Sequence, residues 1–413
     1  MRVIQQRLPK QAIHVYNEAN LSGAEYPSVL NAALSEEGAT RAAGEICAWP
    51  NHARTPLVAL PALAQAVGLS ELYYKDEGGR FGLGSFKALG GAYAVARALA
   101  RFIQLETGEV VDSSALIAGR HRDVAARFTV TCATDGNHGR SVAWGAQLFG
   151  CECVIYVHQT VSQGRIDAVA AYGAQVITHS GNYDDTVRRA ATDADANGWT
   201  VVSDTSWEGY TEIPKDVMHG YCLMCVEAIS QLPAPPTHVI VPGGVGGVAA
   251  AVCAALWWHY GAQRPRLIVT EPSNAACLME SAAAGERSAL DGDIETVMAG
   301  LSCGEPSKIA WQVLSVGAAD FLVVDDDMAV AAMRTLAYPA GNDAAIVAGE
   351  SAACVVAALQ RAHANPQLTN ALGLGDRARV LVFGTEGDTD PELYTQLVGS
   401  SGADIRARAN ARC

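Results

Sequence analysis

The sequence lacks the features that mark several large classes of protein. No uncharged apolar run is long enough to span a membrane, and the longest candidate, residues 245–260, is better explained as a buried helix. Residues 1–10 contain no apolar core of signal-peptide length. The net charge is −14 and no basic run is present. An acidic chain of this kind is a poor binder of nucleic acids or anionic membranes, because like charges repel. We therefore expect a cytoplasmic protein without nucleic-acid or membrane partners.

Disulfide bonds and metal sites also have little support. The eleven cysteines are odd in number and scattered, and chance accounts for the spacing of Cys222 and Cys225. We expect reduced thiols in the cytosol and no bound metal, because no Cys/His cluster shows ligand spacing. A bridge between Cys277 and Cys303 would be unusual in that compartment. The acidic run 325–327 is more typical of a solvated turn than of a metal site.

Hydrophobic residues and glycine are abundant. Half of the 413 residues are hydrophobic, only 17% are charged, and 40 are glycine. A chain of this length fits two or three domains and has ample material for buried sheets, which argues against long disorder. Many glycines are expected where strand–helix turns are tight.

Predicted strands and helices alternate along most of the chain. The predicted strands are residues 72–77, 128–133, 153–157, 175–179, 200–203, 238–241, 266–270, 321–324 and 379–383. Helices are predicted near residues 36–49, 63–68, 88–104, 140–150, 162–172, 183–197, within 210–231, and at 247–260 and 350–362, with 105–126 a surface loop that includes a helix end. This order predicts parallel sheets with right-handed crossovers. The predicted fold class is α/β with two interleaved doubly wound lobes.

One lysine, Lys87, lies where the flexible segment Gly82–Phe86 gives way to a helix-like run. In an apolar, glycine-lined setting a lysine loses hydration and its pKa falls, so that the neutral amine can form a Schiff base with an aldehyde. A solvated lysine at a helix start explains this stretch equally simply. The other motifs of the chain therefore decide between the two interpretations.

A glycine-rich turn, residues 242–247 (Pro-Gly-Gly-Val-Gly-Gly), joins a predicted strand to a predicted helix. The glycines let backbone N–H groups converge on an anion, and the helix N-terminus adds partial positive charge. The turn has neither the Gly-Lys-Ser/Thr of a P-loop nor the GxGxxG spacing, which counts against a nucleotide-binding protein. It predicts a site for a single phosphate monoester, although such turns also occur for tight packing alone.

A second turn, residues 134–139 (Thr-Asp-Gly-Asn-His-Gly), is polar and also joins a strand to a helix. Asn137 can donate a hydrogen bond to a ring hydroxyl or a carboxylate, and the next helix N-terminus can hold a carboxylate. An Asx-type turn that caps the helix is the structural alternative, and it is compatible with this role.

The lysine, the polar turn and the glycine turn, in that order on α/β lobes, resemble the fold-type II pyridoxal-phosphate enzymes. The resemblance extends from Thr55 to Asp388 and implies pyridoxal 5'-phosphate in a cleft between the lobes, a homodimer, and a large cofactor-binding domain of residues 1–90 and 205–413 with a small domain of residues 91–204. By similarity, Lys87 forms the Schiff base and Asn137 bonds the 3′ oxygen. The implied phosphate site is Gly243, Gly244, Val245, Gly246 and Gly247. Glu350 would lie under the ring, and Thr385 would meet the pyridine nitrogen in place of Gly384, which has no hydroxyl group.

Four segments narrow the resemblance to the diaminopropionate ammonia-lyases: residues 85–91, 133–140, 204–210 and 384–391. Serine and threonine dehydratases carry a Ser-x-Gly-Asn-His turn, whereas an acid, Asp135, precedes Gly136 here. Two carboxylates suit 2,3-diaminopropionate, which carries a second cationic amine on C3. The resemblance implies an α,β-elimination that yields pyruvate and two molecules of ammonia.

The same resemblance implies roles for individual side chains. Asp135 and Asp204 would be bases on opposite faces of the substrate, one for the D-isomer and one for the L-isomer. Lys87, once displaced, would pass a proton to the leaving amine. Thr134, Asp135 and His138 would bind the substrate.

Several alternatives stay open from the sequence. The chain could be a serine/threonine dehydratase of the same superfamily, or a non-catalytic α/β protein that binds a small phosphate ligand. Asp204 could instead cap a helix over residues 205–210, and a histidine at the start of a helix, such as His138, is more often structural. Trp207 and Tyr210 could line the site or belong to the core.

Overall fold

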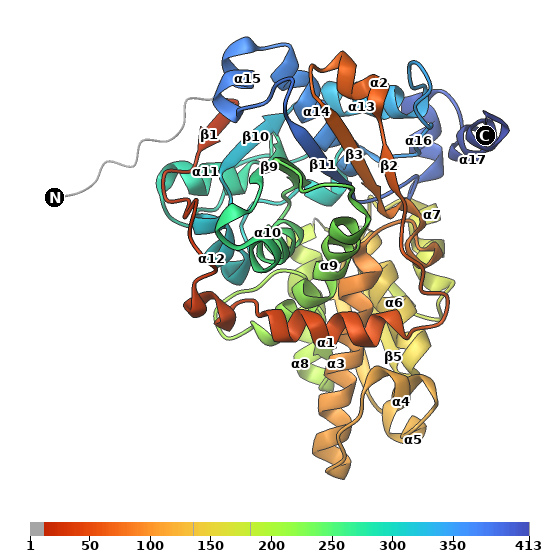
Figure 1. Ribbon diagram of the computed structural model, residues 1–413. Helices are drawn as coiled ribbons and strands as arrows, with labels where there is room; N and C mark the ends of the chain where they lie inside the picture. Colours follow the sequence, from red (N-terminus) through yellow and green to blue (C-terminus); the bar gives the residue numbers. More distant parts are fainter. Residues whose placement is uncertain (1–11, 135, 182, 413) are drawn as a thin grey trace. The chain divides into compact units, whose positions relative to one another are not determined.

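The computed structural model describes residues 12–134, 136–181 and 183–412 (Figure 1). The chain divides into two compact units. Unit 1 comprises residues 1–36, 54–79 and 224–413, and unit 2 comprises residues 37–53 and 80–223. Compared with the predicted domains, segments 37–53, 80–90 and 205–223 belong to the smaller unit. The predicted division stays a prediction.

Unit 1 is built on a seven-stranded sheet with the strand order β1-β10-β9-β8-β11-β3-β2. The five central strands are parallel, and the short edge strands β1 and β2 are antiparallel to their neighbours. The strands are β1 (His14–Tyr16), β2 (Leu57–Ala59), β3 (Glu71–Asp76), β8 (His238–Pro242), β9 (Arg266–Pro272), β10 (Asp320–Val324) and β11 (Arg379–Gly384). Figure 1 shows β3 beside β11, as their register requires.

Both faces of this sheet are buried, as parallel sheets require. On one face, Tyr74, Ile240 and Val382 share a core with helices α13 and α14. The alternate residues, such as Val241 and Phe383, are equally buried on the other face, where α10 packs against β8. The helices of unit 1 are α2 (Pro61–Ala66), α10 (Gly247–Tyr260), α11 (Cys277–Ala284), α12 (Lys308–Gly317), α13 (Asp326–Ala337), α14 (Glu350–His363), α15 (Pro366–Leu372), α16 (Pro391–Val398) and α17 (Gly402–Arg412), with short 3₁₀ turns η1 (Ser28–Ala32), η3 (Gly261–Gln263) and η4 (Ala299–Leu301).

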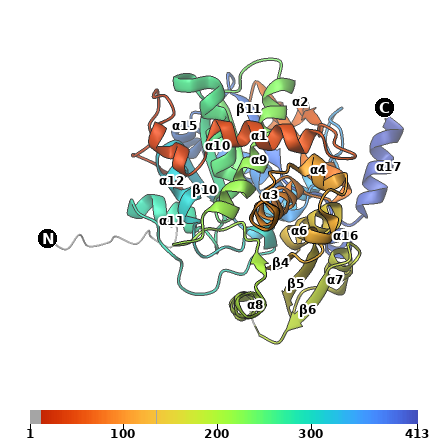
Figure 2. The ribbon, with the colours of Figure 1, turned by 90° about the horizontal axis from the view of Figure 1, so that it is seen from below.

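Unit 2 contains a four-stranded parallel sheet with the order β6-β5-β4-β7. Figure 2 shows α7 on one side of β5 and β6 and α8 on the other. The strands are β4 (Thr129–Ala133), β5 (Glu152–His158), β6 (Gln175–His179) and β7 (Thr200–Val201). The helices are α3 (Lys87–Thr107), α4 (Ser113–Ile117), α5 (Arg122–Ala125), α6 (Asn137–Phe149), α7 (Gln163–Ala170) and α8 (Tyr183–Asn197). Three elements cross the unit boundaries: α1 (Glu36–Cys47), η2 (Glu77–Gly82) and α9 (Glu212–Gln231).

The helix that begins at Lys87 is fixed by close backbone contacts on two sides. A Cβ on Gly145 of α6 would lie 2.7 Å from the Cα of Ala92, and a Cβ on Gly220 of α9 would lie 2.0 Å from the carbonyl oxygen of Leu89. Real Cβ contacts are never this short, so only glycine lets α6 and α9 approach α3 so closely. Lys87 therefore lies at the first position of a rigidly packed helix.

Most predicted elements are present, and the differences have local causes. Residues 105–126 are not mainly a loop, because α4 and α5 form there and the Asp112 side chain caps α4 through the N–H of Ala115. Helix α6 begins at Asn137, three residues earlier than predicted. The acidic run 325–327 opens α13, where acids favour the helix dipole. Six helices of unit 1 that the sequence did not reveal are α11, α12, α13, α15, α16 and α17.

Candidate active site

Lys87 and Asp204 meet within unit 2. The Nζ atom of Lys87 donates a hydrogen bond to the Oδ2 atom of Asp204, and both side chains are about one-fifth exposed. Burial raises the pKa of Asp204, but the neighbouring Lys87 ammonium opposes burial, and the pKa lies below its usual range. Asp204 does not cap a helix over residues 205–210, because the next helix, α9, begins at Glu212. The geometry thus pairs two of the predicted catalytic residues.

The Lys87 amine also lies over two aromatic rings. Its Nζ atom is 5.4 Å from the ring centre of Phe86 and 5.8 Å from that of Tyr221. The two rings contact each other with their centres 4.6 Å apart. Such rings stabilise an ammonium group while excluding water from it. Nothing in the sequence indicates a role for Tyr221, because only the packing of α9 on α3 brings it to Lys87.

The polar turn after β4 lies at the same sheet edge as Asp204, which follows β7, because β4 and β7 are parallel neighbours. Thr134 is buried and its Oγ1 atom accepts the N–H groups of Gly136 and Gly139. Asn137 is the first residue of α6. Asp135, the other predicted base, lies outside the described residues. Thr134 therefore shapes the turn, and its proposed contact with substrate stays a prediction.

His138 extends this group into the interior of unit 2. Its Nε2 atom lies 2.8 Å from the carbonyl oxygen of Val202, and its Nδ1 atom lies 4.0 Å from Oδ2 of Asp204. Burial is the main reason that the pKa of His138 is lowered, and the nearby Lys87 ammonium adds to this effect. A neutral imidazole thus borders the carboxylate that Lys87 contacts.

The Asp204 loop is held by a residue whose role the sequence left open. The hydroxyl group of Tyr210 donates to the carbonyl oxygen of Val201 at 2.8 Å and accepts the N–H of Ser203 at 3.0 Å. Its ring stacks on Trp207, with centres 4.2 Å apart. Tyr210 thus fixes the backbone on the N-terminal side of Asp204.

The glycine turn of unit 1 follows β8 and leads into α10. Gly244 and Gly246 have φ values of 58° and 95°, which favour glycine, and a Cβ on Gly243 would lie 2.7 Å from Cγ of Glu271. In the described part of the chain, the N–H groups of Gly244, Val245 and Gly247 donate to no acceptor. A phosphate group would supply acceptors for these donors at a helix N-terminus.

A buried acid lies directly behind the glycine turn. Glu271 of β9 is fully buried and accepts the N–H groups of Leu278 and Met279 at 2.9 and 2.8 Å. Burial raises the pKa of Glu271 to about 8. At neutral pH the group therefore carries little negative charge to repel an anion on the turn.

The end of β11 lies beside the glycine turn, because β11 and β8 are parallel neighbours. A Cβ on Gly384 would lie 2.0 Å from Cζ and Oη of Tyr74, which is fully buried, so the phenol occupies the place of a side chain at position 384. Thr385 follows and is also buried. Thr385 thus stays the candidate for the pyridine-nitrogen contact in this unit.

The start of α14 meets the same sheet edge. Oε1 of Glu386 accepts the N–H of Ser351, and a Cβ on Gly349 would lie 2.5 Å from the carbonyl oxygen of Gly387. Glu350 is buried at the first position of α14. Its place under a cofactor ring stays a prediction.

A second buried lysine, Lys75, has a different environment. Its Nζ atom donates to the carbonyl oxygen of Thr55, to Glu227 and to Gln231 at 2.8, 3.0 and 2.8 Å. These three bonds use all three N–H donors of an ammonium group. Lys75 is therefore unsuited to a covalent bond with an aldehyde, and Lys87 is the better candidate for that role.

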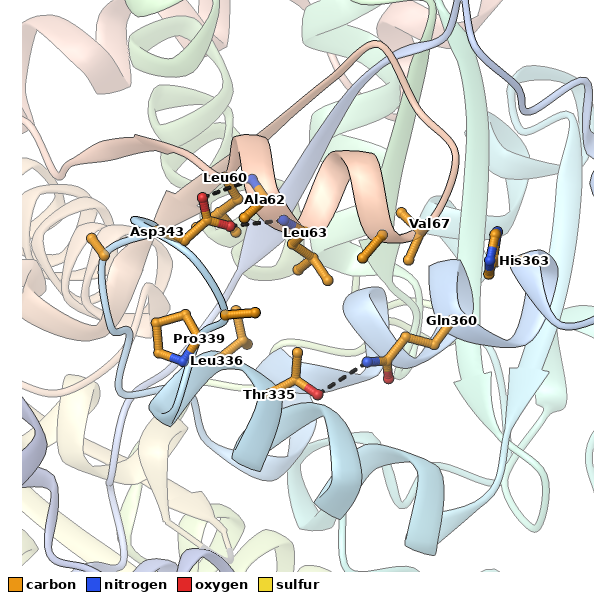
Figure 3. A pocket seen from close by; sticks show the side chains of 13 residues that line it. Leu60, Ala62, Leu63, Val67, Thr335, Leu336, Pro339, Asp343, Gln360 and His363 are labelled. Carbon is orange, nitrogen blue, oxygen red and sulfur yellow. Dashed lines mark hydrogen bonds between the residues drawn. The ribbon is translucent and has the colours of Figure 1, made fainter.

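The described residues include a cavity of about 260 Å³ elsewhere in unit 1 (Figure 3). It lies among α2, α13 and α14 and is mainly aliphatic, with Asp343 bonded to the N–H groups of Ala62 and Leu63. None of the predicted site residues lines it.

Each unit by itself carries groups that suit a part of pyridoxal phosphate. Lys87 offers an amine of the kind that binds an aldehyde, the glycine turn offers unpaired amide donors for a phosphate, and Thr385 offers a buried hydroxyl group. The described residues contain no group of three or more His, Cys, Asp or Glu that could hold a metal ion. No described helix is both long and apolar enough to cross a membrane.

Comparison with known proteins identifies the class. A family described as "Pyridoxal-phosphate dependent enzyme" matches residues 48–385 of the chain. The fold and this match define a pyridoxal-phosphate-dependent enzyme of the fold-type II class, as the sequence predicts.

More specific relatives share most of the chain. A diaminopropionate ammonia-lyase from Escherichia coli (strain K12) is 42% identical over 350 residues, covering 83% of this chain and 87% of the relative. The crystal structure of holo diaminopropionate ammonia lyase from Escherichia coli has a TM-score of 0.84 and 37% identity, covering 93% of this chain and 96% of that one. A structure of the same Escherichia coli protein in complex with D-serine has a TM-score of 0.84 and 38% identity over the same shares. The chain belongs to the diaminopropionate ammonia-lyase family.

Proposed function

We propose that the chain converts 2,3-diaminopropionate and water to pyruvate and two molecules of ammonia by α,β-elimination. The observation that carries this proposal is the hydrogen bond between the amine of Lys87 and the carboxylate of Asp204, in a chain that belongs to this family. Pyridoxal phosphate, when bound, links covalently to the substrate amine and withdraws electrons from Cα, which acidifies the Cα–H bond.

The chain's own residues would then hold the reactants and move protons. We propose that Lys87 binds the cofactor's aldehyde and that the N–H groups of residues 243–247 bind its phosphate. The hydroxyl group of Thr385 would face the pyridine nitrogen, and the Asn137 amide would face the 3′ oxygen. The last two assignments rest on the family resemblance and on the place of each residue at the carboxyl end of a strand.

Asp204 is proposed as the base for one substrate isomer and Asp135 as the base for the other. The low pKa of Asp204 keeps it ionised near neutral pH, and only the ionised form of a carboxylic acid can act as a base. Lys87, released from the cofactor when substrate binds, would then protonate the leaving amine. Thr134 and His138 are proposed to border the substrate.

The first test is the absorption spectrum of the purified protein, followed by pyruvate detection with each isomer. Lys87→Ala should lose the visible cofactor band and pyruvate release together, because the amine both binds the cofactor and moves the proton. Lys215→Ala, on the exposed start of α9 and paired with Glu212, is the matched control and should keep both. Persistence of the band and the activity in Lys87→Ala would refute the assignment.

A serine/threonine dehydratase activity is the second candidate. The complex of the Escherichia coli relative with D-serine favours testing it. A panel of diaminopropionate, serine and threonine isomers separates the two activities, and we expect the highest kcat/KM for a diaminopropionate isomer. We also propose a homodimer with a cytoplasmic location, which light scattering and cell fractionation would test.

A further inference from the structure

Among the described residues, only one of the two ring nitrogens of His138 has a hydrogen-bond partner. Nε2 lies 2.8 Å from the carbonyl oxygen of Val202, which can only accept, so Nε2 carries the hydrogen. The neutral ring therefore has its lone pair on Nδ1. Nδ1 is buried and has no hydrogen-bond partner among the described residues. An unpartnered acceptor in the interior has an energetic cost, which suggests that it serves the reaction.

The lone pair of Nδ1 lies near the carboxylate proposed as a base. Oδ2 of Asp204 is 4.0 Å away, and this same oxygen atom accepts the hydrogen bond from Lys87. The distance is longer than a hydrogen bond by about 1 Å. A small movement of the side chains would therefore bring Nδ1 within reach of a proton on Asp204.

We propose that His138 acts through Asp204 as a proton relay, which removes the proton that Asp204 takes from Cα. The inference rests on the proposed role of Asp204 as a base. In the relay the O–H bond of the protonated Asp204 breaks and an Nδ1–H bond forms on His138. The products are a carboxylate and an imidazolium, whose Nε2–H keeps its bond to Val202. The imidazolium later returns the proton to water or to the departing ammonia, so that protons balance over the cycle.

The surroundings of His138 suit a proton held for a short time. Burial and the Lys87 ammonium disfavour the imidazolium, while Asp204 and the Val202 carbonyl favour it. When Lys87 gives its proton to the leaving amine, its positive charge beside Asp204 is lost, and one of the two effects that oppose the imidazolium is removed. The ring is therefore neutral at rest and can be charged during turnover.

Two variants separate the relay from a purely structural role. Gln can place its amide nitrogen where Nε2 lies and still donate to Val202, but it has no basic atom at the position of Nδ1. For the isomer that Asp204 serves, we expect His138→Gln to lower kcat roughly tenfold or more. In an Asp204→Asn background, His138→Gln should cause no further loss, because there is no proton to pass on. Asp195→Asn on the exposed surface of α8 is the control and should leave both isomers unaffected.

Two further measurements make the test independent of turnover. Nitrogen-15 NMR of labelled histidine in the cofactor-free protein should show His138 as the Nε2–H tautomer, and Asp204→Asn should change its titration. The visible cofactor band and the unfolding midpoint of His138→Gln should match those of the unaltered protein.

The outcomes separate failure of the relay from failure of the proposed function. Additive losses in the double variant, the Nδ1–H tautomer, or an unchanged kcat in His138→Gln would each overturn the relay. His138→Gln, Asp204→Asn and the double variant could instead lose pyruvate release with both isomers, while the double variant loses no more than Asp204→Asn alone. That result would support the relay and would refute only the assignment of one isomer to Asp204 and the other to Asp135. Absence of any pyruvate release from the unaltered, cofactor-loaded protein would refute the proposed function. The NMR measurement would then still show whether His138 carries its hydrogen on Nε2, as the geometry of the relay requires.

Discussion

Replacing Gly384 tests how the end of β11 is packed. A Cβ at this position would lie 2.0 Å from Cζ and Oη of Tyr74, whereas ordinary contacts are at least 3.4 Å. Tyr74 has no exposed surface and cannot turn away. We therefore expect Gly384→Ala to lower the free energy of unfolding by about 3 kcal/mol, at the upper end of the cost of overpacking.

A second substitution shows whether the collision is the cause. Tyr74→Ala alone should cost about 3–5 kcal/mol because it leaves a cavity. In the double variant the methyl group introduced at position 384 enters that cavity, so the combined loss should be smaller than the sum by about 2 kcal/mol. Gly375→Ala is the matched control, since a Cβ there meets nothing within 4 Å, and it should change stability by less than about 0.5 kcal/mol.

Urea unfolding of the cofactor-free proteins, followed by circular dichroism, gives these differences from the midpoints and a common slope. Additive losses, or a Gly384→Ala variant as stable as Gly375→Ala, would refute the reasoning. Either result would mean that the phenol of Tyr74 can leave its place, and that a serine hydroxyl at position 384 would be sterically acceptable.

Two further predictions concern the glycine turn and the acid behind it. Glu271 has a pKa near 8 in the folded protein, above the ordinary 4.5, so its contribution to stability is present at low pH and is lost as the pH rises toward 8. The stability of Glu271→Gln relative to the unaltered protein should therefore rise between about pH 5 and pH 8, and parallel stability–pH curves would contradict this. Gly246→Ala should weaken cofactor binding about tenfold or more in an absorbance titration, because the turn needs φ of 95° there and Leu314 lies 3.0 Å from a Cβ. Gly285→Ala, at a positive φ in open space, is its control, and equal cofactor affinities of the two variants would refute the prediction.

Local patterns in the sequence predicted most of the elements. The strand and the helix around the glycine turn could be predicted because a β-branched run, a glycine-rich turn of five residues and an apolar run follow one another directly in the sequence. Helix α8 has the bounds that its sequence predicts. The short helices α4 and α5 were missed because they have only five and four residues and lie in a stretch of mixed character, although Asp112 supplies a side-chain cap for α4.

Contacts between distant residues could not be read in this way. Nothing in the sequence around residue 384 indicates that Tyr74, more than 300 residues earlier, fills the missing side chain's place. The register of β3 on β11 alone brings the two together. The same holds for Glu271, whose high pKa arises from burial behind a turn on a different strand. The types of residue at the site can be predicted from the sequence. Which residues contact one another depends on the order and register of the parallel strands.

The loop that carries Asp204 combines residues that the sequence indicates with contacts that only the fold creates. The sequence singled out residues 204–210 but left two interpretations of the tyrosine at their end, a wall of the site or part of the core. The structure gives Tyr210 a third role, since its hydroxyl group joins Val201 to Ser203. Those two bonds hold the backbone just before Asp204, which in turn faces Lys87 and His138. The role proposed for Asp204, to accept a proton on one face of the substrate, needs this rigidity, because a shift of about 1 Å can cost a hundredfold in rate. The positioning of Asp204 therefore depends on a phenol that touches neither reacting partner.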